Sequence, residues 1–264
     1  MSTPYQFTQG RIPLLISIPH MGQEIPEALQ ARMTQAGLQI PDTDWHMDRL
    51  YTFANEMGAS VLQATYSRYV VDLNRSPTDE HLYPGQTKTG LCPEHTFRGD
   101  AIYQAGDSVS DEEKAQRVTQ YWQPYHQKLQ ETLEQLRSEH GQVLLWDAHS
   151  IASVLPRLFP GKLPDLNIGT SGGASCDQAL LNAVEASLVG CPFEWVSNGR
   201  FKGGYITRQY GNPAQGIHTI QLEMCQSLYM NESHPFEYRD DLAQQVAPTV
   251  RQMVQAAYGA LETL

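Results

Sequence analysis

The sequence predicts an α/β fold whose sheet is mixed or mostly parallel and is covered by helices on both faces. Along the chain, apolar runs typical of buried strands alternate with segments of helical periodicity. Three apolar runs end at polar side chains that could bind a metal ion or a charged group: 14–19 at His20, 69–71 at Asp72 and 143–146 at Asp147. Ligands of such sheets bind beyond the carboxyl ends of the strands, so the sequence also predicts a site there.

A helix is predicted over residues 41–58. Apolar side chains recur there at intervals of three or four, and Gly58 follows as a stop signal. Within such a helix Asp44 and Asp48 are one turn apart, so both would lie on one flank of the apolar stripe. Two carboxylates are therefore expected to turn toward the interior.

Two strands and a long loop are expected after this helix. Residues 60–65 and 68–73 have the pattern of strands and are expected to form a hairpin or a close pair. Residues 76–107 are rich in proline and glycine and have no sustained period, so they predict a long loop that holds Arg98. Loops of that length in a compact domain are usually functional.

A long helix is predicted from Ser110 to Gly141, since Ser110 and Glu113 form a capping box and apolar residues then recur on one face. Pro124 is expected to kink it, and His126 on this helix is the first of the remaining histidines to consider for a functional role. The second half repeats the alternation. Its expected elements are strands at 143–149, 166–169, 193–196 and 217–222, helices at 176–188 and 239–261, and a turn-rich segment at 198–208.

The composition favours one domain that acts on a small molecule. The chain has 264 residues and no linker, repeat or low-complexity tract, so we expect a single domain over residues 1–264. Its formal net charge of -11 repels nucleic acid and anionic membranes. The N-terminus lacks the features of a signal peptide, and no apolar stretch approaches the length of a membrane span, which favours a cytoplasmic protein.

The histidines at two of the strand ends suggest a metal site. A catalytic site of the zinc type needs three protein ligands from histidine, aspartate or glutamate and an open position for water. His20 and His149 can supply two ligands if their strands are near neighbours. Asp48 is the preferred oxygen ligand and Asp44 the alternative, while Asp147 could accept the second N–H of His149. Each histidine taken singly could instead be a buried structural residue.

Glu223 follows the last apolar strand, and a buried glutamate is seldom tolerated without a partner. Beside a metal ion it could serve as a general base and later as an acid; a salt bridge to an arginine is the alternative. Arginine side chains in turns or loops could bind the carboxylates of a substrate in bidentate fashion. Each could instead form a salt bridge that fixes a loop. These candidates are Arg75, Arg98, Arg200 and Arg208.

Six segments together resemble the N-formylglutamate amidohydrolase family, in the same order and over nearly the whole chain. They lie at residues 18–22, 42–51, 71–75, 146–150, 203–208 and 221–224. The family is grouped with zinc carboxypeptidase-like and aspartoacylase-like hydrolases. The resemblance therefore implies a zinc carboxypeptidase-like, three-layer α/β/α sandwich around a mixed, mostly parallel sheet.

The resemblance also implies a set of site residues. Metal ligands are implied at His20, at His149 and at an acidic residue near Asp48. Glu223 takes the place of the catalytic glutamate, and an Asn-Arg pair that grips the substrate falls on Asn74 and Arg75.

One departure concerns the acidic ligand. The HxxE spacing of carboxypeptidases is missing, since Gln23 stands three residues after His20 and Glu24 comes one later. The acidic ligand therefore stays open among Asp48, Asp44 and Glu24.

The activity that the resemblance implies is hydrolysis of N-formyl-L-glutamate to L-glutamate and formate during histidine breakdown, with a divalent metal ion, zinc being the expected one. Glu223 would act as the base, and Arg75 would help the metal to polarise the formyl carbonyl. Hydrolysis of another N-acyl amino acid is a close alternative. A different class is a non-catalytic binder of acidic amino acids, which would have no use for a metal. The sequence leaves the oligomeric state open.

Overall fold

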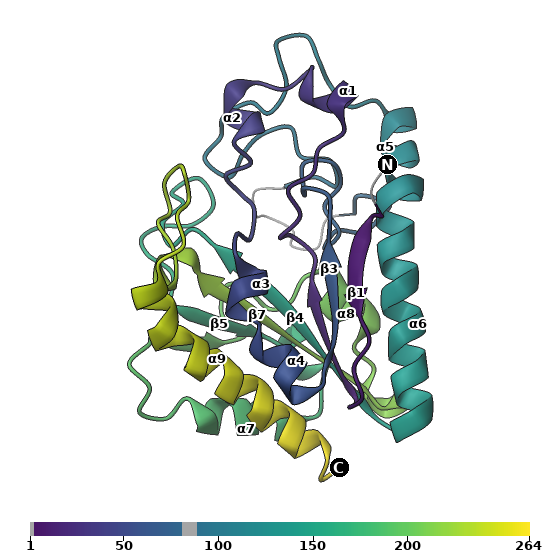
Figure 1. Ribbon diagram of the computed structural model, residues 1–264, viewed down its shortest axis with the longest axis vertical. Coiled ribbons are helices and arrows are strands. Elements are labelled where there is room, and N and C mark those ends of the chain that lie inside the picture. The colour runs from purple at the N-terminus through teal and green to yellow at the C-terminus, as the bar shows by residue number, and fades with distance from the viewer. Residues whose placement is uncertain (1–2, 81–88) are drawn as a thin grey trace.

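The computed structural model describes residues 3–80 and 89–264, and at its centre is a seven-stranded mixed sheet (Figure 1). The strands are β1 (Tyr5–Thr8), β2 (Leu14–Ile18), β3 (Ser60–Ala64), β4 (Val143–Ile151), β5 (Leu166–Gly169), β6 (Trp195–Ser197) and β7 (Ile217–Cys225). Their order across the sheet is β1-β3-β2-β4-β7-β5-β6. The neighbours are parallel except for β1 against β3 and β5 against β7, so the expected mixed, mostly parallel sheet is confirmed.

Helices of very different lengths surround the sheet. The α-helices are α1 (Glu27–Gln30), α2 (Gln35–Leu38), α3 (Met47–Leu50), α4 (Phe53–Met57), α5 (Asp111–Arg117), α6 (Gln123–His140), α7 (Gln178–Ser187), α8 (Tyr205–Tyr210) and α9 (Asp240–Leu261). A π-helical turn, η1 (Val118–Trp122), joins α5 to α6, and three short 3₁₀ turns are η2 (Ser171–Gly173), η3 (Pro213–Gln215) and η4 (Gln226–Leu228). In the described parts of the chain, none of these helices is long and apolar enough to cross a membrane.

Both faces of the sheet are covered, as β2 shows most directly. All five of its residues are buried, and successive side chains point to opposite faces of the sheet. Ile16 belongs to the apolar cluster that includes α7 and α9, whereas Leu15 belongs to the cluster that includes α6. In Figure 1, α9 and α6 flank the sheet. The expected α/β/α sandwich is thus confirmed.

The helix predicted over residues 41–58 is broken into α3 and α4. The first of them begins only at Met47, because His46 has a φ of 59°, in the left-handed region. The Nε2 atom of His46 lies 2.7 Å from the carbonyl oxygen of Phe236, so a segment far away in sequence holds this turn. Asp44 consequently lies before the helix and Asp48 in its first turn, not together on one helical flank.

The prediction of a strand over 68–73 is wrong, since these residues form turns and irregular backbone. The position beside β3 that a hairpin partner would fill is taken by β1, which the sequence analysis did not anticipate, and β2 lies on the other side. The segment expected to be rich in turns at 198–208 ends within the short helix α8, which covers Tyr205–Tyr210. The described part of the predicted loop at 76–107 is irregular, and residues 81–88 of it lie outside the described residues.

The long helix predicted from Ser110 to Gly141 is present as α5, η1 and α6. The side chain of Ser110 caps it by accepting a hydrogen bond from the backbone N–H of Glu113, and Gly141 ends it with a φ of 84°. Pro124 stands just after the π-helical turn. A proline lacks an N–H and its ring collides with the preceding turn, so a local change of helix type accommodates it.

His126 has a structural position on α6. The ring is stacked on Trp122 at a centroid distance of 3.6 Å, its Nε2 donates to the carbonyl of Leu73 at 2.8 Å, and its Nδ1 accepts from the hydroxyl of Tyr210 at 2.9 Å. Burial lowers the pKa of His126 to about 3, although the Leu73 carbonyl opposes this shift. The imidazole is therefore neutral in the folded protein.

We predict that His126 makes the protein less stable in mild acid. Below about pH 6.5 the unfolded chain takes up a proton on this ring and the folded chain does not, so the free energy of unfolding falls as the pH falls toward 3. By pH 5 the loss amounts to about 2 kcal/mol, at roughly 1.4 kcal/mol per pH unit. The free energy of unfolding is measured with urea at pH 7.5 and at pH 5. It should differ less between the two pH values in His126→Gln than in the parent. His140→Gln, at an exposed histidine, is the control and should show the same pH dependence as the parent. If His126→Gln also showed the same pH dependence as the parent, the prediction would be contradicted.

Candidate metal centre

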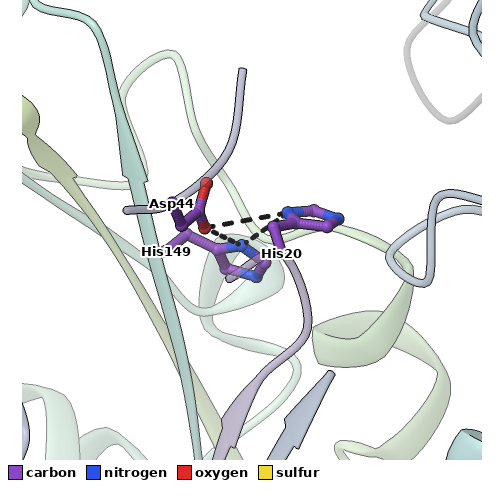
Figure 2. Close-up of side chains that lie close together, drawn as sticks. All are labelled: His20, Asp44 and His149. Atoms are coloured by element: carbon purple, nitrogen blue, oxygen red, sulfur yellow. Dashed lines mark hydrogen bonds and ion pairs between the residues drawn. The ribbon is translucent and has the colours of Figure 1, made fainter. Parts of the chain in front are cut away.

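Two neighbouring parallel strands bring His20 and His149 together. His20 lies two residues beyond the end of β2, and His149 lies near the end of β4, which pairs with β2. The segment before α3 crosses the same edge of the sheet, because the backbone N–H of Asp44 donates to the carbonyl of His20 at 3.0 Å. Figure 2 shows the three side chains of His20, Asp44 and His149 turned toward one another.

The atoms that face one another are both Nδ1 atoms and one carboxylate oxygen. The two Nδ1 atoms are 3.1 Å apart, and Asp44 Oδ2 lies 3.4 Å from His149 Nδ1 and 3.8 Å from His20 Nδ1. All three side chains are buried, and one ligand atom from each lies within 4.8 Å of the other two. His20, Asp44 and His149 could therefore hold a metal ion.

The far nitrogens of the two rings are held from behind by carboxylates. His20 Nε2 donates to Asp72 Oδ1 at 2.7 Å, which leaves the lone pair of a neutral ring on Nδ1. His149 Nε2 lies 3.1 Å from Asp147 Oδ2 and 3.0 Å from Asn74 Nδ2. Asp147 thus occupies the place expected from its spacing to His149. Carboxylates in this position fix the orientation of metal-binding histidines and increase their basicity.

Several ionisable groups in and around the cluster have pKa values far from their usual range. Burial would raise the pKa of Asp72, but Arg68 and His20 outweigh it and hold that pKa well below its usual range. Burial and the positive charge of Arg68 lower the pKa of His20. Burial also opposes a proton on His149, but Asp147 and Asp44 prevail and raise its pKa well above the usual range.

A cation fits this cluster for two reasons. Among the described residues, Asp44 Oδ1 is buried and has no hydrogen-bond partner, although the other oxygen accepts from the backbone N–H of Ser150 at 3.2 Å. The second reason is the charge balance: in the described parts of the chain, the five buried carboxyl groups in and around the cluster outnumber its buried cationic groups, the guanidinium of Arg68 and the ring of His149. The carboxyl groups belong to Asp42, Asp44, Asp72, Asp147 and Glu223. Buried charges are costly unless they are paired, so a divalent cation would complete the site.

Glu223 lies directly beside the cluster. It is on β7, in register with His149 on the parallel strand β4, and is 8% exposed. Burial raises the pKa of its carboxyl group, while the charge of His149 lowers it and that of Asp44 raises it further. A carboxyl group whose pKa is raised in this way is suited to take and return a proton near neutral pH.

The other two candidates for the acidic ligand lie elsewhere. Asp48 is exposed in the first turn of α3, and Glu24 is exposed as well. Neither belongs to the cluster with His20 and His149. The preference for Asp48 therefore does not match the geometry, because the helix that was expected to carry both aspartates begins three residues after Asp44.

The candidate arginines have different partners in the structure. Arg75 is half-buried, follows Asn74 and is close enough to Asp72 to lower its pKa; its side chain donates to the carbonyl and the hydroxyl of Thr89 at 3.0 and 2.6 Å. Arg98 and Arg208 are exposed, and Arg208 Nε donates to the carbonyl of Gly203 at 3.0 Å.

Arg200, the fourth candidate, donates to the carbonyl of Leu158, and its guanidinium lies over the ring of Phe159 at 5.2 Å. Arg75 is thus next to the cluster through Asp72. Burial raises the pKa of the Asp42 carboxyl group, and Arg98 is close enough to that group to oppose the rise.

Asn74 connects the cluster to α8. Its Nδ2 contacts His149, and its Oδ1 accepts from the backbone N–H of Ile206 at 2.8 Å. A Cβ added at Gly204 would lie 2.3 Å from Asn74 Nδ2, so the glycine permits this close approach. The side chain of Asn74 is consequently fixed from two sides.

Sequence reasoning missed Arg68. It is 7% exposed and donates from Nη2 to Asp72 Oδ2 at 2.7 Å. The signal available in the sequence was an arginine four residues before an aspartate at the start of an apolar run. That signal was hidden because the run was interpreted as a strand, in which residues four apart do not form such a pair.

A parallel sheet edge that carries two histidines, a buried carboxylate and an adjacent glutamate is typical of hydrolytic enzymes that hold a divalent cation. The comparisons with known proteins define the class more closely. The model of the N-formylglutamate amidohydrolase family matches residues 12–230. The chain belongs to this family.

Two relatives and two solved structures are similar over nearly their whole lengths. N-formylglutamate deformylase of Pseudomonas putida is 49% identical over 98% of both chains, and that of Pseudomonas aeruginosa is 48% identical over 97% of this chain and 96% of its own. A crystal structure of N-formylglutamate amidohydrolase from Ralstonia eutropha has a TM-score of 0.80 at 24% identity, covering 99% of this chain and 98% of its own. A gene product from Agrobacterium tumefaciens has a TM-score of 0.74 at 18% identity, covering 99% and 97%. The two structures show that the fold is shared.

Proposed function

We propose that this chain is a metal-dependent amidohydrolase that converts N-formyl-L-glutamate and water into L-glutamate and formate. The observation that carries the proposal is the buried cluster of His20, Asp44 and His149, in which two imidazole nitrogens and one carboxylate oxygen lie close enough together to hold a divalent cation. The names of the two Pseudomonas relatives supply the substrate. We extend the proposal to a role in histidine breakdown in the cytoplasm, in keeping with the family.

The three residues of the cluster would hold the cation, with zinc as the proposed ion because imidazole and carboxylate ligands suit it. When bound, such an ion supplies a Lewis acid that polarises a carbonyl and makes water more acidic. Asp72 and Asp147 keep the two imidazoles turned toward it from behind.

Glu223 would move the proton during the reaction. It would accept a proton from the water whose oxygen bonds to the formyl carbon, and it would deliver that proton to the amide nitrogen as the C–N bond breaks. The raised pKa of its carboxyl group supports both steps, since the group can hold the proton between them.

Substrate binding is proposed for Asn74, Arg75, Arg98, Arg200 and Arg208. Arg75 has the strongest support because its segment touches the cluster, whereas Asn74 already contacts His149 and would act there mainly by orienting that ring. The three remaining arginines are candidates for the side-chain carboxylate of the substrate, since guanidinium groups bind carboxylates through paired hydrogen bonds.

Formate release from N-formylglutamate and from N-formylglutamine tests the substrate directly. The amide analogue would leave an arginine of the site without its partner, which costs about 2 kcal/mol or more, so kcat/KM should fall by roughly 30-fold or more. Equal kcat/KM values would favour a broader hydrolase of N-acyl amino acids. Tight binding of N-formylglutamate with no release of formate would favour a non-catalytic binder.

A further inference from the structure

A third residue stands behind the Asp72–His20 pair. Asp72 uses both carboxylate oxygens: Oδ1 accepts from His20 Nε2 at 2.7 Å, and Oδ2 accepts from Arg68 Nη2 at 2.7 Å. Oδ1 also accepts from the backbone N–H of Asn74 at 2.9 Å. Arg68, Asp72 and His20 therefore form one continuous buried chain of charge-assisted hydrogen bonds, the strong kind.

The guanidinium of Arg68 is itself held in place. Its Nη1 donates to the carbonyl of Asp42 at 3.4 Å, and its plane lies over the ring of Phe97 at 4.7 Å. The carboxylate of Asp42 accepts from the hydroxyl of Tyr69 at 2.6 Å and from the backbone N–H of Phe97 at 2.8 Å. Arg68 thus joins the support of His20 to the segment of Asp42, which is the segment that carries Asp44 two residues later.

The support behind His149 is different. Asp147 Oδ2 lies 3.1 Å from His149 Nε2, and its other oxygen, Oδ1, accepts from the hydroxyl of Ser17 at 3.3 Å. A guanidinium therefore stands behind one imidazole of the cluster, while a hydroxyl stands behind the other. Any effect of Arg68 on metal binding by the cluster should therefore be transmitted through His20.

We propose that Arg68 is a positioning residue that acts through Asp72 to hold Nδ1 of His20 toward the cation site, and that this support is needed for tight metal binding. The inference rests on the proposed function, because it concerns the affinity of the same cluster for its metal. Partners of this kind behind a ligand are worth about 10- to 100-fold in metal affinity.

The chain offers a matched control in Arg117. This arginine is also buried, at 5% exposure, and also pairs with a carboxylate, that of Glu113. It donates to the carbonyls of Tyr69 and Val70, just beside Arg68 in the sequence. Its other hydrogen bonds within the described residues go to Tyr103 and Glu113, so none of them reaches the cluster. Its replacement removes a buried guanidinium of the same kind without touching Asp72.

The test is a competition titration of zinc against a chromophoric chelator, run on the full chain together with thermal unfolding followed by circular dichroism. Arg68→Met should weaken zinc binding by about 10- to 100-fold. Arg68→Lys should lie between Arg68→Met and the parent, because lysine keeps the charge but not the planar fork that reaches both partners. Arg117→Met should bind zinc within threefold of the parent, even if it unfolds at a lower temperature.

A second set of variants tests whether Arg68 affects zinc affinity through Asp72. Removal of Arg68 leaves Asp72 buried without its cation, which could prevent folding, so Arg68→Met is also made in an Asp72→Asn background, where that charge is gone. If Arg68 acts through Asp72, the second substitution should change the zinc affinity of Asp72→Asn by less than twofold. Fully additive losses would overturn the proposed route.

The outcomes separate the two proposals. If the parent binds zinc and Arg68→Met binds it within threefold of the parent, the proposal about Arg68 is overturned and the proposed function stands. If the parent does not bind zinc, the proposed function fails, and the proposal about Arg68 falls with it.

Discussion

Asp44→Asn should abolish zinc binding and almost all formate release. The substitution keeps the shape of the side chain but removes the charged oxygen that lies 3.4 Å from His149 Nδ1 and 3.8 Å from His20 Nδ1. A metal ion that acts as a Lewis acid is worth several kcal/mol, so a loss of about 4 kcal/mol, or about 10³-fold in kcat/KM, is expected. Zinc content by elemental analysis and the rate of formate release are the two measurements.

Asp48→Asn is the matched control for this experiment. Asp48 is an aspartate in the same segment, but it is exposed on α3. Its substitution should leave zinc content and kcat/KM within about twofold of the parent, since exposed substitutions of this kind rarely change stability. Full zinc occupancy in Asp44→Asn combined with loss of zinc in Asp48→Asn would reverse the assignment.

Glu223→Gln should reduce kcat by about 10²- to 10⁴-fold while zinc content and KM stay near those of the parent. Glutamine preserves the size and much of the hydrogen bonding of the side chain, but it cannot hold the proton that passes from water to the leaving amine. Because Glu223 lies beside the cluster and is not among the residues that could hold the ion, the variant should differ from Asp44→Asn in keeping its metal. A kcat within threefold of the parent would remove Glu223 from the mechanism.

That His20 and His149 lie close together could be predicted from sequence, because their positions depend on local pattern. His20 directly follows one apolar run and His149 lies three residues beyond another, and parallel strands that are neighbours present their carboxyl ends at one edge of the sheet. Glu223 could be predicted for the same reason, since β7 is the next parallel neighbour of β4.

The choice between Asp44 and Asp48 could not be made from local pattern. Helical periodicity continued through residues 41–58, but the chain turns at His46, whose ring contacts the carbonyl of Phe236. That contact joins segments 190 residues apart, so it cannot be predicted from the local periodicity of the sequence. The start of α3, and with it the placement of Asp44 at the sheet edge, is decided by tertiary structure.

Arg68 was missed for a related reason. The segment after β3 has the composition of a strand, yet the place beside β3 belongs to β1, from the N-terminal end of the described chain. Only when that segment is seen to turn can Arg68 and Asp72 approach each other as an ion pair four residues apart. Competition between two segments for one edge of a strand is a property of the whole sheet, and residue patterns do not reveal it.

The most direct test of the account is removal and return of the metal in the unmodified chain. The protein is treated with a chelator, freed of it, and then titrated with zinc while formate release from N-formylglutamate is followed. We expect formate release to stop after chelation and to return in proportion to added zinc, reaching a plateau at one ion per chain. Undiminished formate release from a chain that holds no metal would contradict it.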